Sequence, residues 1–202
     1  MKCCLIIGVG KHDVCLEGKN AVSPYLQGKK IWEDWERHKE DVSLPLIGPA
    51  LTELKKIIKY QIKPTGKLKD LNKIYLIATH QKKEGFKSKD KDTIWFAYII
   101  KNLLETKWKI SSTKIEMILL DDLEIPPIVK KIRKLEQAIH QSEHIFLKLE
   151  GTLPVLNFLL AARLILNFHD KVKIIRVSDK AVATKDYAFV EYILRAKKLQ
   201  ST

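Results

Sequence analysis

The stretch CCLIIGVGKHD, residues 3–13, passes from an apolar run into a glycine turn with polar side chains behind it. The apolar run predicts a buried strand. Gly8 and Gly10 allow a sharp turn and let a ligand approach the backbone closely. A phosphate beside Lys11 and His12 would suit such a turn. The dinucleotide-binding pattern G-x-G-x-x-G is incomplete, however, because Asp13 stands where the third glycine would be.

Further apolar runs alternate with amphipathic stretches along the rest of the chain. The predicted strands are residues 3–9, 73–79, 114–120, 144–150 and 172–178. The predicted helices, with apolar residues at helical spacing, are 49–62, 92–106, 126–140 and 153–168. The last of these is apolar on nearly every side and is expected to be deeply buried. Strands that alternate with helices predict an α/β fold: a Rossmann-like, mostly parallel sheet with helices on both faces.

Two stretches depart from this alternation. Residues 16–48 carry many charges and two tryptophans, and we expect a charged insertion made of a short helix and a loop. Residues 80–91 form a lysine-rich loop after a predicted strand. Residues 188–199 are expected to form a last helix. The sequence contains no internal repeat and no low-complexity linker. We therefore predict a single domain over 1–202 without a separate effector domain.

The composition is that of a globular protein with a strong positive charge. The chain has 202 residues and a formal net charge of +13. Such an excess attracts polyanions, but a solvated lysine-rich surface explains it equally well. No apolar stretch reaches the ~18 residues that cross a bilayer, and no signal peptide is evident, so no membrane partner is expected. An odd number of cysteines without metal-ligand spacing favours the reducing cytoplasm and no metal site.

Ligands of open parallel sheets bind beyond the carboxyl ends of the strands, so the residues that follow each strand are the candidate site. Gly151 and Thr152, between a strand and a helix, could hold an anion, or Thr152 could simply cap the helix. The adjacent Asp121 and Asp122 could bind a metal but more often shape a turn. The candidate ligand-binding residues are Gly10, Lys11, His12, Asp13, Thr79, His80, Gln81, Glu150, Gly151, Thr152 and Asn157.

The glycine turn, "IATHQ" with "KDT" before an apolar helix, and "GTLPVLN" after a later strand together resemble the CARF domain, the CRISPR-associated Rossmann fold. The resemblance spans roughly residues 3–178 and rests on the order and spacing of these motifs. It implies a homodimer that binds a cyclic oligoadenylate, the messenger of type III CRISPR systems, in a groove across the dimer. Cyclic tetra-adenylate is the expected ring, no cofactor is expected, and a separate or truncated effector domain is an expected partner.

Several functions stay open at this point. The chain could be the sensor domain of a CRISPR defence response, or a ring nuclease that cleaves the messenger without a metal. Cleavage would use Lys11 and His12 as the catalytic residues, with Thr152 positioning the ligand. Arg163 and His169 resemble a ribonuclease pattern, but a snorkelling arginine and a helix end explain them better. The chain could instead be an unrelated Rossmann-like nucleotide-binding enzyme or an RNA-binding protein.

Overall fold

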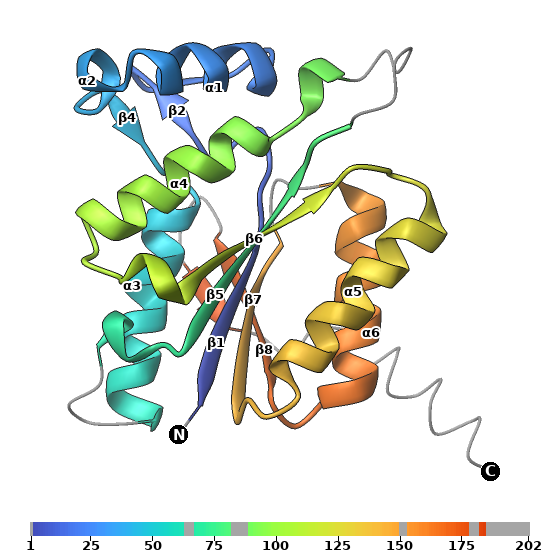
Figure 1. Cartoon of the computed structure of the whole chain (residues 1–202). Coiled ribbons are helices and arrows are strands. Elements are labelled where there is room, and N and C mark those ends of the chain that lie inside the picture. Colours follow the sequence, from blue (N-terminus) through green and yellow to red (C-terminus); the bar gives the residue numbers. More distant parts are fainter. Residues whose placement is uncertain (1, 63–66, 82–88, 150–152, 178–181, 185–202) are drawn as a thin grey trace.

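Six strands form the central sheet of the computed structural model, which describes residues 2–62, 67–81, 89–149, 153–177 and 182–184 (Figure 1). The strand order is β6-β5-β1-β7-β8-β9. The first five are parallel, and β9 pairs with β8 in the antiparallel direction. Their bounds are β1 (Cys3–Gly8), β5 (Lys73–Thr79), β6 (Ile115–Leu120), β7 (His144–Lys148), β8 (Val172–Val177) and β9 (Val182–Thr184).

Four helices cover the two faces of this sheet. Helices α3 (Ile47–Ile57) and α4 (Ile94–Thr106) lie on one face, and α5 (Ile125–Ile139) and α6 (Pro154–Phe168) lie on the other (Figure 1). The predicted α/β fold with a Rossmann-like, mostly parallel sheet is therefore confirmed. Each of the five predicted strands and four predicted helices is present, with ends that differ by two residues or fewer except for 49–62. That stretch is α-helical only to Ile57 and continues as the π-helical segment η1 (Ile58–Ile62).

Strand β1 lies at the centre, between β5 and β7, and all of its residues are buried. Because successive side chains of a strand point to opposite faces, β1 serves both halves of the core. Cys3, Leu5 and Ile7 pack into the cluster below α3 and α4. Cys4 and Ile6 pack into the cluster below α5 and α6. An uninterrupted apolar run is what a strand with two covered faces requires.

The direction in which the chain adds strands reverses beside β1. From β1 the chain builds β5 and β6 on one side, and it then crosses to build β7 and β8 on the other side. The connections after β1 and after β7 therefore leave the sheet in opposite directions. In open α/β sheets this switch point is where a crevice opens at the carboxyl ends of the strands.

The charged insertion is more structured than a helix and a loop. It contains α1 (Pro24–Glu33), α2 (Trp35–His38) and a three-stranded antiparallel sheet of β2 (Cys15–Leu16), β3 (Lys19–Asn20) and β4 (Val42–Ser43). Glu17 and Gly18 both have positive φ, 51° and 72°, in the two-residue turn between β2 and β3, as type I′ hairpins require. Helix α1 packs on α4 and lies beyond the carboxyl ends of the central strands (Figure 1).

Helix α6 is not deeply buried on all sides, contrary to the prediction. Leu156, Leu160 and Leu164 face the core, but Val155 and Phe158 are 39% and 56% exposed. One side of the helix packs on the sheet, and the opposite side is exposed. The predicted final helix, 188–199, lies outside the described residues. Within the described ranges, no helix is both long enough and apolar enough to cross a membrane.

Close packing of α1 on α4 depends on Gly28. A Cβ at this position would lie 2.8 Å from Trp95 Cβ and 2.9 Å from Phe96 Cδ1. We expect Gly28→Ala to lower the free energy of unfolding by about 1–3 kcal/mol, as overpacked cores do, and urea denaturation measures this. Gly48→Ala in α3 is the control, since nothing lies within 4 Å of its added Cβ, and it should stabilise by about 0.5–1 kcal/mol. Equal effects of the two substitutions would contradict this account.

Candidate ligand site at the carboxyl edge of the sheet

A cavity of about 290 Å³ opens at the carboxyl ends of β1 and β5. Its walls come from the turn after β1, the end of β5, the insertion, and the segments that lead into α4 and α6. The lining residues are Val9, Gly10, Lys11, Val22, Pro24, Thr79, Lys91, Thr93, Leu153 and Pro154. The cavity thus lies at the edge of the sheet where the strand order reverses, as expected for an open α/β sheet.

Three helices begin at this cavity. Pro24 is the first residue of α1, while Thr93 and Leu153 are the N-cap residues of α4 and α6. Ser23 Oγ accepts from the Leu26 N–H and so caps α1, whereas α4 and α6 have no side-chain cap hydrogen bond within the described part of the chain. Helix N-termini carry unpaired N–H groups and partial positive charge.

The charged lining residues have the same sign as these helix ends. Lys11 and Lys91 contribute positive charge, and the described lining residues include no carboxylate. Helix dipoles and lysines that converge on one cavity favour an anion such as a phosphate group. The cavity therefore has the electrostatic character of an anion site.

The turn after β1 is held by Asp13. The Gly10 N–H donates a hydrogen bond of 2.8 Å to Asp13 Oδ2, and the Asp13 N–H donates back to the Gly10 carbonyl over 3.2 Å. The side chain of Asp13 is fully buried, so it faces the interior of the protein and not the cavity. Its role in the described structure is to fix the turn that carries Lys11 at the cavity wall.

A buried ion pair completes this arrangement. The Lys148 ammonium group, on the last residue of β7, donates to Asp13 Oδ1, and both side chains are almost inaccessible to solvent. Burial raises the pKa of Asp13 above its ordinary value, and the Lys148 charge and the hydrogen bonds from Lys148 and Gly10 oppose that rise. Because a buried charge is costly without a partner, each member of this pair depends on the other.

A second pair of contacts ties the end of β5 to the start of α4. The Thr79 N–H donates to Thr93 Oγ1, and the Thr93 N–H donates to Thr79 Oγ1, each over 3.1 Å. Gln81, two residues after Thr79, is bonded to Asp92, the residue before Thr93. Asp92 accepts from the Gln81 N–H at 2.8 Å and from Gln81 Nε2 at 3.0 Å. Asp92 thus braces the residues after β5, and all four side chains are buried.

The structure brings together only part of the predicted site. Gly10, Lys11 and Thr79 line the cavity, whereas Asp13 and Gln81 support its walls from inside. His12, His80 and Asn157 do not line it, although His80 Nδ1 and Asn157 Oδ1 are buried without a hydrogen-bond partner among the described residues. The predicted ligand residues Glu150, Gly151 and Thr152 lie outside the described residues.

Sequence reasoning missed Lys91 and Lys148. Lys91 belongs to the lysine-rich loop, and which lysine of such a loop returns to the sheet depends on the tertiary fold. Lys148 did carry a signal, because it is a charged residue inside the apolar strand HIFLKLE. A buried lysine needs a carboxylate partner, and Asp13 was the polar residue after the neighbouring strand.

The remaining motifs have structural explanations. Asp122 Oδ1 accepts from the Glu124 N–H at 3.0 Å and so shapes the turn before α5. Arg163 forms two hydrogen bonds with Glu136 of α5, at 2.8 and 2.7 Å, and His169 is the C-cap of α6. The three cysteines are buried thiols. The described residues contain no group of three or more potential metal ligands.

Comparison with known proteins adds no relative: no protein-family model, curated protein or solved structure matches the chain.

The Asp13–Lys148 pair is open to a direct test. We expect Asp13→Asn and Lys148→Met each to lower the free energy of unfolding by about 3–5 kcal/mol, because each breaks a buried ion pair by removing one of its two charges. The double variant should lose much less than the sum of the single losses. Urea denaturation of all four proteins gives the coupling. Additive losses, or single losses below about 1 kcal/mol, would contradict a coupled buried pair.

Proposed function

We propose that this chain binds a cyclic oligoadenylate, with cyclic tetra-adenylate as the expected ring, and acts as the sensor of a type III CRISPR defence response. The observation that carries the proposal is the cavity at the carboxyl edge, where three helices begin beside Lys11 and Lys91. The resemblance of the turn after β1, "IATHQ…KDT" and "GTLPVLN" to the CARF domain supplies the identity of the ligand.

The chemistry of the cavity suits one nucleotide of such a ring. Lys11 offers a charge that a phosphodiester can pair with, and the first turns of α4 and α6, which have no side-chain cap among the described residues, can donate backbone hydrogen bonds. Val22 and Leu153 provide apolar surface that can contact a base. Positive charge together with apolar surface is the combination that a nucleotide requires.

The size of the cavity supports a homodimer. A volume of about 290 Å³ is at the small end of ligand sites, which range from about 300 to 1,000 Å³. A ring of four nucleotides therefore needs more surface than this cavity alone. Two copies of the chain about a two-fold axis would present each group twice, matching the repeated units of the ring.

Binding is better supported than cleavage. Cleavage would form a bond between the ribose 2′-oxygen and phosphorus, break the bond from phosphorus to the 5′-oxygen, and pass a proton from the 2′-hydroxyl to the 5′-oxygen. This needs a base and an acid around the phosphate. Of the two proposed catalytic residues, Lys11 lines the cavity and His12 does not. A ring nuclease therefore stands as the alternative, to be separated by product analysis.

Calorimetric titration with cyclic tri-, tetra- and hexa-adenylate tests the binding proposal. We expect one ring per two chains. Lys11→Ala should weaken binding about tenfold at low salt, and the difference from wild type should shrink as salt screens the contact. Lys134→Ala, an exposed lysine of α5 that does not line the cavity, is the matched control and should bind as wild type does. No binding of any ring, or equal effects of both variants, would overturn the proposal.

The same proteins separate a sensor from a nuclease. Incubation of excess cyclic tetra-adenylate with wild type, Lys11→Ala and His12→Ala, followed by separation of linear products, measures turnover. We expect intact rings in every case. Linear products from wild type that disappear in His12→Ala would establish the ring nuclease instead. Binding of one mononucleotide per chain would favour an unrelated nucleotide-binding enzyme.

A further inference from the structure

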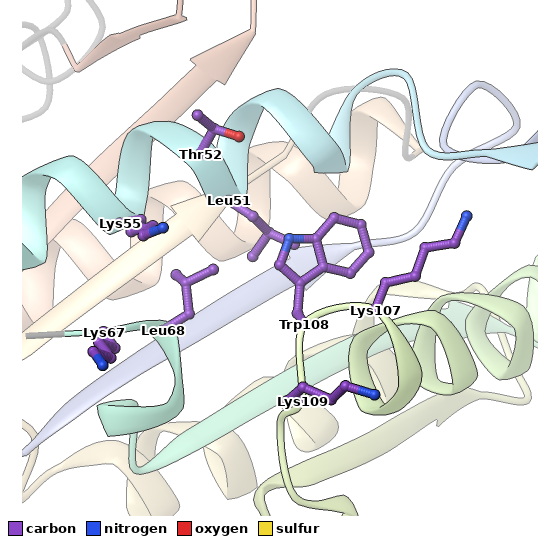
Figure 2. Close-up of a pocket in the computed structure, with 8 residues that line it drawn as sticks. All are labelled: Leu51, Thr52, Lys55, Lys67, Leu68, Lys107, Trp108 and Lys109. Carbon is purple, nitrogen blue, oxygen red and sulfur yellow. The ribbon is translucent and has the colours of Figure 1, made fainter.

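A second and larger cavity, of about 490 Å³, lies between α3 and the segment that follows α4 (Figure 2). Its other wall is the short segment η2 (Leu68–Asp70), which leads into β5. Helix α4 begins at the carboxyl-edge cavity and ends beside this one. With 13 residues, it separates the two cavities by about 20 Å.

Four lysines surround this second cavity. Lys55 comes from α3, Lys67 from the residue before η2, and Lys107 and Lys109 from the segment after α4. All four side chains are exposed, and none forms an ion pair within the described part of the chain. Among the lining residues that the structure describes there is no carboxylate.

Two carboxylates that lie close in the chain to these lysines have partners elsewhere or in the backbone. Glu53 pairs with Lys56 at 3.2 Å, and Asp70 accepts from the Lys67 backbone N–H at 2.8 Å. The negative end of the α4 dipole can account for Lys107, and that of α3 can account for Lys55, which lies in the last turn of that helix. Neither helix end accounts for Lys67, the residue before η2. Lysines from three separate segments thus gather at this cavity, and none of them forms an ion pair in the described part of the structure.

An aromatic side chain lies between these lysines. Trp108 is partly buried against the core beside Leu51 and Leu68, and the rest of its indole is exposed in the cavity (Figure 2). Lys109 has φ 55°, the left-handed conformation, at the residue that turns the chain from α4 towards β6. Lys107 and Lys109 directly precede and follow Trp108 in the chain, and all three line the cavity.

We propose that this lysine–tryptophan cavity binds single-stranded nucleic acid, with a base stacked on Trp108 and backbone phosphates held by the lysines. Aromatic side chains in a basic groove are how proteins hold single strands without reading their sequence. An acidic peptide would use the lysines but would gain little from an exposed indole. This activity is independent of the cyclic ligand proposed for the other end of α4.

Fluorescence anisotropy of a labelled 12-nucleotide oligouridylate at a series of salt concentrations tests the proposal. We expect Lys107→Ala/Lys109→Ala to weaken binding at least tenfold and to reduce the slope of log K against log salt by about 1.4, since a single strand loses about 0.7 per phosphate contact. Trp108→Leu should weaken binding about fivefold or more, and Trp108→Phe should retain most of it because an aromatic face remains. Thermal denaturation of each variant shows whether it is folded.

A matched control makes the outcome decisive. Lys130→Ala/Lys134→Ala removes two exposed lysines of α5 and should change affinity less than threefold. Equal losses in both double variants would mean that net charge alone attracts the strand and would overturn the site. So would an absence of binding by wild type, a folded Trp108→Leu that binds as wild type does, or displacement of the oligonucleotide by polyglutamate at equal charge.

Discussion

The carboxyl edge of the sheet depends on the buried contact between Asp13 and Lys148. Asp13 follows β1 and Lys148 ends β7, and the connections after these strands leave the sheet in opposite directions, so the pair closes the point at which the strand order reverses. An apolar pair could fill the same space at a lower desolvation cost. The ionic pair also orients the Asp13 carboxylate. Because this carboxylate accepts from the Gly10 N–H as well, it determines the shape of the turn after β1. Lys11 is presented at the cavity because the residue two positions later is anchored inside.

The polar residues at this edge divide into two groups with different tasks. Asp13, Gln81, Asp92 and the two threonines are buried and hold the loops in position. Asp13 bonds to Gly10 and Lys148, while Gln81 bonds to Asp92 and the threonines bond to each other. Lys11 and Lys91, with the helix N-termini, are the groups that face the cavity. Buried hydrogen bonds of this kind keep a loop in one conformation. In general, a loop that binds an anion through its backbone N–H groups needs this rigidity, because the N–H groups must already point at the site before the anion arrives.

The sequence was sufficient to predict the architecture because its signals are local. The five apolar runs and the helical periodicity between them identified the elements, and their alternation implied a parallel sheet covered on two faces. The insertion could not be predicted in detail, because β2, β3 and β4 have two residues each and exist only through their pairing.

The site was predictable only in part, for a related reason. Asp13 and Gln81 are of residue types that bind ligands as readily as they brace loops, and only burial tells these roles apart. Val22 and Lys91 reach the cavity from segments remote from each other in the chain, so their meeting is a property of the tertiary structure. Lys148, in contrast, could have been suspected, because a lysine within a buried apolar strand has few other reasons to be there.

A buried cysteine on the central strand β1 can report whether that strand is still folded into the sheet. Cys3 and Cys4 lie on β1 with 6% and 1% of their surface exposed, and burial raises the pKa of Cys4 to about 11. Since the thiolate is the reactive form, the Cys4 thiol in the folded state is shielded from an alkylating reagent by both geometry and protonation. Its rate of alkylation therefore follows the opening of the sheet between β5 and β7, on a strand that both halves of the core share. An unmodified chain can thus be followed during local unfolding without introducing a label.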